Sequence, residues 1–172
     1  DGNIRFSKAL AGGALRDAGS YAVYAIRFVM SAEPIHVIGY SHDSGNWGVD
    51  TTFAGTMKFD NGAIGNITTN MQQPFRCFIT IHGSAGRIEI PNMFDDSGPI
   101  VIKKGDGRTS QDDQVIAVQA PNRFLVQLDE FTHCVLTGEK PEFPAEDGLA
   151  NTAVLEALYE SAISGASVSL GT

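Results

Sequence analysis

Asp17 and Tyr21 are the residues of this chain whose types and spacing best suit chemistry. Residues four apart on a helix share a face, so both side chains can point at one ligand. A phenol or a carboxylate within reach of a substrate hydroxyl can bind it or relay its proton. The spacing also fits a charge in the first helical turn followed by a tyrosine at the edge of the core. Taken alone, it favours this structural interpretation.

Other residue types that often carry chemistry form no cluster in the sequence. The histidines show no ligand-like pairing, so no metal site is predicted; they are His36, His42, His82 and His133. Cys77 and Cys134 each lie inside an apolar pattern, which predicts buried free thiols in a reducing compartment. Trp47 suits stacking on a sugar and anchoring a loop equally well. Arg27 is expected to be a surface or interface charge.

The candidate pair lies at the start of a predicted helix, 17–30, in which apolar residues recur at helical spacing. Gly12 and Gly13 precede this helix, and we expect them to allow a tight approach to its start rather than to bind phosphate. Glu33 precedes Pro34, and a residue before proline avoids helical backbone, so the helix is predicted to end there.

Alternating apolar and polar residues then predict at least five strands. The first covers 35–41. The next two form a hairpin over 52–71, because Asn61-Gly62 favours a two-residue turn with positive φ. A further strand is predicted from Phe75 to His82 and a short one over 87–90. Strands that follow one another through short links predict a largely antiparallel sheet.

The polar segment 92–114 is expected to be an exposed, mobile excursion with an edge strand at 100–103. Two helices follow, one from the N-cap Asn122 to Gly138 and one over 147–164, ended by Gly165. No repeat or internal boundary is visible, so a single domain over 1–172 is predicted. Its fold class is α+β: a largely antiparallel, open-faced sheet with helices packed on one face, and an opposite face apolar enough to invite a second subunit.

Charge and hydropathy exclude two classes of partner. The 172 residues carry 12 basic and 20 acidic side chains, a formal net charge of −8. No basic cluster forms a stripe that could follow phosphates, so no nucleic-acid partner is predicted. The apolar runs are far shorter than the ~20 residues of a membrane-spanning helix, so no membrane partner is predicted either. The short apolar runs and the free thiols together predict a cytoplasmic protein.

Four ordered blocks of the sequence resemble one known family. They read GGALRDAGSYAVYAIRFVM (12–30), DTTFAGTMKFDNGAIGNI (50–67), ITIHGSAGRIEI (79–90) and TGEKPEFPAEDGLANTAVLEALYESAISGASVSL (137–170). In this order they resemble the C-terminal domain of the glucose-fructose oxidoreductase / inositol dehydrogenase / rhizopine catabolism family. Four blocks that span nearly the whole chain are far more specific than any one of them.

The resemblance implies a glyceraldehyde-3-phosphate dehydrogenase-like C-terminal domain that follows an N-terminal Rossmann domain holding NAD or NADP. No glycine-rich fingerprint follows a strand and opens a helix in these residues. The dinucleotide-binding half is therefore expected to be absent from this chain, and no cofactor-binding residue is assigned. The chain is expected to supply substrate contacts and oligomer interfaces and to be inactive alone.

In the family pattern, Asp and either His or Tyr stand at the positions of Asp17 and Tyr21, which the resemblance makes the catalytic and substrate-binding residues. The tyrosine version resembles the branch of glucose-fructose oxidoreductase, xylose dehydrogenase and dihydrodiol dehydrogenase. A phenol has a pKa of about 10, so it needs a nearby cation to act as a base at neutral pH. The family supplies a lysine from a Glu-Lys-Pro motif in the Rossmann half. Lys140 lies in such a tripeptide, but between two predicted helices, and is not expected to take that part.

The expected function is that of the C-terminal domain of an NAD(P)-dependent oxidoreductase. Its substrate would be a sugar, a polyol or a dihydrodiol-type alcohol, and it would form a homo-oligomer through the sheet face. The alternative is a non-catalytic module of the same fold, used for oligomerisation or for binding a sugar as a sensor.

Overall fold

The computed structural model describes residues 2–94, 97–105 and 113–171, in two compact units. One unit comprises Asp1–Gln73 and Phe143–Thr172, and the other Pro74–Glu142. The sequence shows no such boundary. Pro74 has no backbone N–H to donate to a sheet, so strand pairing is interrupted there.

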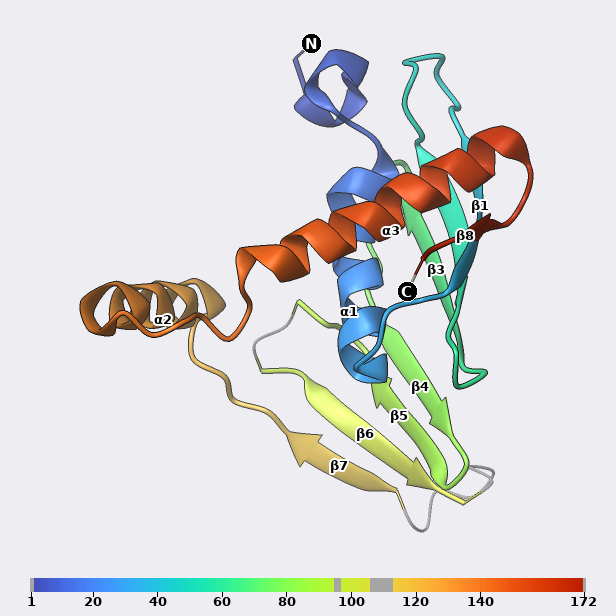
Figure 1. Ribbon diagram of the computed structural model, residues 1–172. Helices are drawn as coiled ribbons and strands as arrows, with labels where there is room; N and C mark the ends of the chain where they lie inside the picture. Colours follow the sequence, from blue (N-terminus) through green and yellow to red (C-terminus); the bar gives the residue numbers. More distant parts are fainter. Residues whose placement is uncertain (1, 95–96, 106–112, 172) are drawn as a thin grey trace. The chain divides into compact units, whose positions relative to one another are not determined.

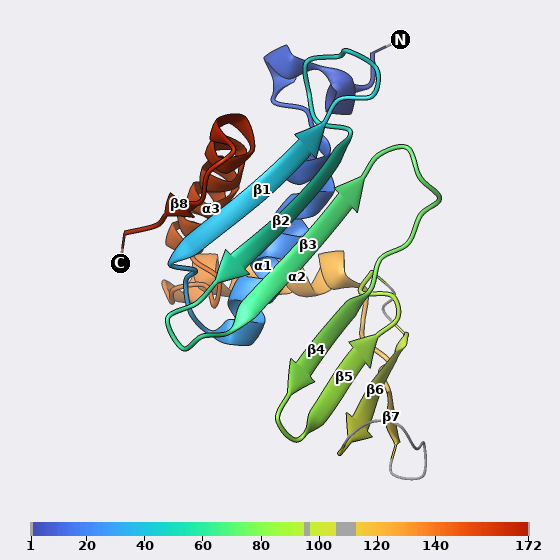
Figure 2. The same ribbon diagram turned by 90° about the vertical axis from the view of Figure 1, so that its right-hand side faces the viewer.

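The first unit is a four-stranded antiparallel sheet with helices on one face (Figure 1). The strand order is β3-β2-β1-β8, for β1 (His36–His42), β2 (Thr52–Lys58), β3 (Ile64–Asn70) and β8 (Val168–Ser169). Figure 2 shows the open face of β1, β2 and β3, with α1 (Ser20–Met30) and α3 (Ala145–Ser164) behind it. The predicted α+β class, an antiparallel sheet with helices on one face, is confirmed.

The core of the first unit lies between this sheet and its helices. Phe53, Met57 and Phe59 are spaced at even-numbered intervals along and just after β2, and all three are completely buried. Val154, Leu155 and Leu158 of α3 pack against them in one cluster; the others are Leu15, Val23, Val37, Ile67 and Ala157. The hairpin turns where it was predicted to, but through Asp60, Asn61 and Gly62 rather than through two residues: the Gly62 N–H donates to the Phe59 carbonyl oxygen at 3.0 Å, and Gly62, at φ 84°, is the turn residue with positive φ. Burial of one face of β2 therefore fixes the register of the hairpin.

The second unit carries a separate antiparallel meander. Its strands are β4 (Ile79–Gly83), β5 (Gly86–Ile90), β6 (Pro99–Lys104) and β7 (Gln114–Ala117), in sequence order. The expected strand from Phe75 begins only at Ile79, and Phe75 is exposed. The strand predicted at 100–103 forms as β6, but its predicted place at the edge of the sheet was wrong, because β6 pairs with β5 and with β7. Within the expected excursion, residues 95–96 and 106–112 lie outside the described residues.

Helix α2 (Arg123–Thr137) also belongs to the second unit. Its predicted ends are confirmed: the Asn122 side chain accepts a hydrogen bond from the Phe124 N–H, and Gly138 ends the helix in the left-handed region. Its apolar stripe remains exposed; the residues are Phe124, Leu128, Phe131 and Val135. None of the described helices combines the length and apolar character needed to cross a membrane.

Candidate functional site

The helix that carries the predicted pair begins with a π-helical turn. Residues Leu15–Gly19 form this turn, which runs directly into α1 at Ser20. The sequence predicted an ordinary helix from Asp17. π turns have wider i→i+5 hydrogen bonds, are rare and recur at functional sites. Asp17 and Tyr21 thus stay about one turn apart on a continuous helical segment.

Both predicted site residues are open to solvent. The Asp17 side chain is 39% exposed and Tyr21 is 54% exposed. Arg5 donates a hydrogen bond from Nε to Oδ2 of Asp17 at 2.7 Å. This arginine lies in the short 3-10 turn Ile4–Phe6, which Asn3 caps through the Arg5 N–H. The N-terminal segment therefore orients a carboxylate that a ligand can reach.

A residue distant in sequence caps the start of this helix. Asp50, 7% exposed, precedes β2 and accepts a hydrogen bond from the Leu15 N–H at 2.8 Å. Its other carboxylate oxygen accepts one from the Tyr159 hydroxyl at 2.6 Å. Burial, together with the bond to Asp50, raises the pKa of Tyr159 above that of a free phenol. The hydroxyl therefore remains a protonated donor.

Gly12 and Gly13 serve the tight approach expected of them. Gly13 has φ 124°, and a Cβ there would lie 2.2 Å from Oδ1 of Asp50. A Cβ on Gly12 would lie 2.4 Å from the Arg5 carbonyl oxygen. Larger residues would push the N-terminal segment and Asp50 away from the helix start.

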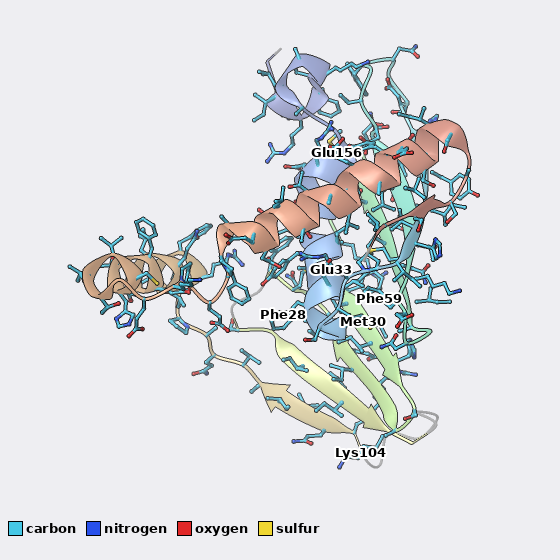
Figure 3. The ribbon with its side chains drawn as sticks, in the orientation of Figure 1. Phe28, Met30, Glu33, Phe59, Lys104 and Glu156 are labelled. Carbon is cyan, nitrogen blue, oxygen red and sulfur yellow. The ribbon has the colours of Figure 1, made fainter. Side chains whose placement is uncertain are left out.

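Helix α3 contacts the same helix start. Arg16 donates a hydrogen bond to Glu156 at 2.8 Å, and its guanidinium lies over the Tyr159 ring, 4.7 Å from the centroid. Figure 3 shows Glu156 on α3, where that helix passes the start of α1. The hydrogen bond to Glu156 raises the pKa of Arg16. Arg16 therefore remains a cation beside the site.

The loop before Asp50 places Trp47 near the N-terminal segment. Asp43 holds the loop by accepting N–H bonds from Gly45, Trp47 and Gly48. The Trp47 ring contacts Phe6, with centroids 4.7 Å apart. Trp47 is thus a loop anchor in this structure, and 43% of the residue stays exposed to solvent.

The prediction for Arg27 was wrong. Its side chain is 5% exposed and pairs with Glu33 at 2.7 Å and with Asp147 at 2.9 Å. It lies on the face of α1 that meets the first turn of α3, where two carboxylates replace water around the guanidinium. The hydrogen bond to Glu33, labelled beside α1 in Figure 3, is the main cause that raises the pKa of Arg27. Arg27 therefore holds the two helices together.

None of the hydrogen bonds or ion pairs described for the cysteines and histidines reaches Asp17 or Tyr21. Cys77 and Cys134 are free thiols but only half-buried, less than predicted. The four histidines are exposed, and His133 pairs with Glu139 at 3.1 Å. Across the described ranges, no group of three or more metal-binding side chains occurs. Lys140, beside Glu139, is exposed.

The residues present do not fit a dinucleotide. Every strand pair in the described part of the chain is antiparallel, so it holds no strand–helix–parallel-strand unit. Such a unit is what places a helix N-terminus at the pyrophosphate of NAD(P).

Sequence reasoning named Asp17 and Tyr21 but missed the residues that support them. Arg5 binds Asp17 across 12 residues of sequence. Tyr159 binds Asp50 across 109 residues. Local spacing carries no signal for such pairs. Gly12 and Gly13 were the one sequence signal, because they indicated a close approach to the helix start without naming its partner.

Comparisons with known proteins agree with this architecture. Residues 1–89 match the family model described as the GFO/IDH/MocA C-terminal domain. A D-xylose 1-dehydrogenase (NADP(+)) of Haloferax volcanii is 28% identical over 171 residues, 98% of this chain and 51% of the relative. The chain thus spans about half the length of the curated relatives it matches.

Solved structures share the fold. An aldose-aldose oxidoreductase from Caulobacter crescentus, complexed with glycerol, matches 99% of this chain and 52% of its own with a TM-score of 0.83 and 28% identity. A 3-ketoreductase from Actinomadura kijaniata, with NADP and TDP-benzene, matches 94% of this chain and 49% of its own with the same TM-score, at 22% identity. The second likeness bears on the fold alone.

Proposed function

The chain belongs to the GFO/IDH/MocA C-terminal domain family, and on that basis we propose that it is the substrate-facing domain of an NAD(P)-dependent oxidoreductase. The substrate is a sugar, a polyol or a dihydrodiol-type alcohol. The observation that carries the proposal is the exposed pair Asp17 and Tyr21 at one helix start, with Asp17 held by Arg5. The similarity to a xylose dehydrogenase and to an aldose-aldose oxidoreductase supports it.

In this proposal the two side chains bind and deprotonate the reacting alcohol. The Tyr21 hydroxyl and the Asp17 carboxylate hydrogen-bond the substrate hydroxyl, and one of them takes up its proton. Arg5 keeps the carboxylate in the orientation that the substrate requires. NAD or NADP, held by a half of the protein outside this chain, supplies the hydride acceptor.

The open face of the first sheet is the proposed oligomer interface. Tyr40 and Ile64 are exposed on it, and polar cross-strand pairs such as Thr56 with Asn66 flank them. A second copy of the same face would bury these apolar groups in a symmetric contact. We also propose a cytoplasmic location, which the two free thiols support.

The test is the activity of the complete protein with NAD or NADP and a panel of aldoses, polyols and dihydrodiols. Asp17→Asn and Tyr21→Phe should each lower kcat/KM about 100-fold, the range typical of losing an acid–base group. Asp60→Asn, which changes an exposed carboxylate in the β2–β3 turn, should leave it unchanged.

Intact turnover after both site substitutions would contradict the proposed catalytic pair. Sugar binding without turnover in the wild type would instead favour the sensor module.

The oligomer interface is tested separately, by comparing the mass of the complete protein in light scattering with that of a Tyr40→Lys variant. An unchanged oligomer in this variant would contradict it.

A further inference from the structure

Asp50 is a buried carboxylate that the proposed reaction does not use directly. A buried charge is tolerated only where hydrogen bonds replace its hydration. Here the replacement comes from two elements: the Leu15 N–H at the helix start and the Tyr159 hydroxyl of α3. The Asp50 carbonyl oxygen also accepts the Ala14 N–H at 2.8 Å. Asp50 therefore binds two consecutive N–H groups of the turn that leads to Asp17.

The approach of these groups is specified sterically. A Cβ on Gly13 would lie 2.2 Å from Oδ1 of Asp50 and 2.8 Å from the Tyr159 hydroxyl. Glycine at this position is thus needed for all three to meet. The Gly13 carbonyl oxygen in turn accepts the Asp17 N–H at 3.0 Å. A continuous chain of hydrogen bonds consequently runs from Tyr159 through Asp50 to the turn that bears Asp17.

We propose that Asp50 and Tyr159 are positioning residues for the catalytic pair, fixing the helix start so that Asp17 meets the substrate hydroxyl in reactive geometry. The inference rests on the proposed function. Neither residue touches the substrate in this arrangement. They act through the backbone of residues 13–17, whose displacement by even about 1 Å costs catalysis heavily.

A double-mutant cycle in the complete protein tests the inference. Tyr159→Phe removes the hydroxyl donor but keeps the ring that Arg16 and Phe53 contact, so the fold is retained. We expect this substitution to lower kcat about 10-fold with KM for the alcohol within about twofold, because it loosens geometry rather than binding. In an Asp17→Asn background it should have almost no further effect. Tyr24→Phe, the same hydroxyl deletion made on α1 instead of α3, should leave both constants unchanged.

Each outcome separates the two proposals. Tyr159→Phe could lower kcat by the same factor in the wild type and in the Asp17→Asn variant. That result would mean that the hydroxyl acts on stability alone, and it would overturn the positioning role. A rise in KM with constant kcat would overturn it too. A wild type without turnover on any alcohol would overturn the proposed function and this inference with it. Asp50→Asn should repeat the pattern, and Tyr159→Phe decides if that variant does not fold.

Discussion

The two units of this chain differ in burial rather than in apolar content. All residues of the hydrophobic core lie in the first unit. In the second unit, no described residue is fully buried. Yet the register of its meander places isoleucines on one face of the sheet: Ile79, Ile81, Ile88, Ile90, Ile100, Ile102 and Ile116. An apolar face becomes a core only when a second layer covers it, as α1 and α3 cover the first sheet.

This difference predicts unequal local stability. The first unit gains free energy from burial, whereas the second is held mainly by strand pairing and turns. The candidate site is built entirely in the first unit, from the helix start, the loop before β2 and α3. The following substitutions test how strict the division is.

The largest effect is expected in the core of the first sheet. Phe53→Ala empties a completely buried position and should lower the free energy of unfolding by about 3–5 kcal/mol in urea titrations. Phe131→Ala, at a residue of α2 that is 66% exposed, should lower it by less than about 0.5 kcal/mol. Comparable losses would show that the second unit also buries a core in solution.

The next effect concerns the buried cation of the first unit. Arg27→Met leaves Asp147 and Glu33 without their shared partner and should cost about 2 kcal/mol of unfolding free energy. Arg76→Met, which removes an exposed guanidinium over the Phe78 ring in the second unit, is the control and should cost under about 0.5 kcal/mol. If both variants unfold at the same urea concentration, the buried ion pairs of Arg27 stabilise the protein no more than the exposed Arg76 does.

A smaller effect should appear at alkaline pH. The folded state raises the pKa of Tyr159, mainly through burial, so above pH of about 10 the unfolded chain loses this proton first. The stability that the phenol contributes is fully present below that pH and declines above it, by at most about 1.4 kcal/mol per pH unit. Thermal melts of wild type and Tyr159→Phe between pH 8 and pH 11 should therefore converge as pH rises. Parallel curves would show that the hydroxyl is not protected.

The smallest effect concerns Cys77, one of the two thiols of the second unit. Desolvation raises the pKa of the half-buried Cys77, so less of it is thiolate near neutral pH. Alkylation of Cys77 in the folded protein, followed by peptide mass spectrometry, should be a few-fold slower than in the unfolded chain. Complete protection would mean that a further layer covers this unit in solution.

Local signals predicted most of the elements. The chain turns at Gly62, Asn122 begins its helix, and Gly138 and Gly165 end theirs, because each acts on neighbouring backbone groups. The division of the sheet after Asn70 was not foreseen, since alternation shows which face of a strand is apolar but not which strand it pairs with. The prediction of a surface charge at Arg27 failed for a related reason, since its carboxylate partner Asp147 lies 120 residues away in sequence.

The candidate site shows the same limit. The family pattern placed Asp17 and Tyr21, and both lie exposed on one helical segment. The π-helical turn beneath them was not predicted, because it depends on contacts with other parts of the fold. Arg5 carried no signal at all, since only the folded N-terminal segment brings it to Asp17.

The long-range cap at the helix start has a consequence for biosynthesis. Tyr159 is made 109 residues after Asp50. At about 5–20 residues per second, Asp50 waits about 5 to 20 s for the Tyr159 hydroxyl. Until then the turn that bears Asp17 has no complete cap. The turn that bears Asp17 is thus synthesised before the residue that completes its cap, and it reaches its final geometry only after Tyr159 has been made.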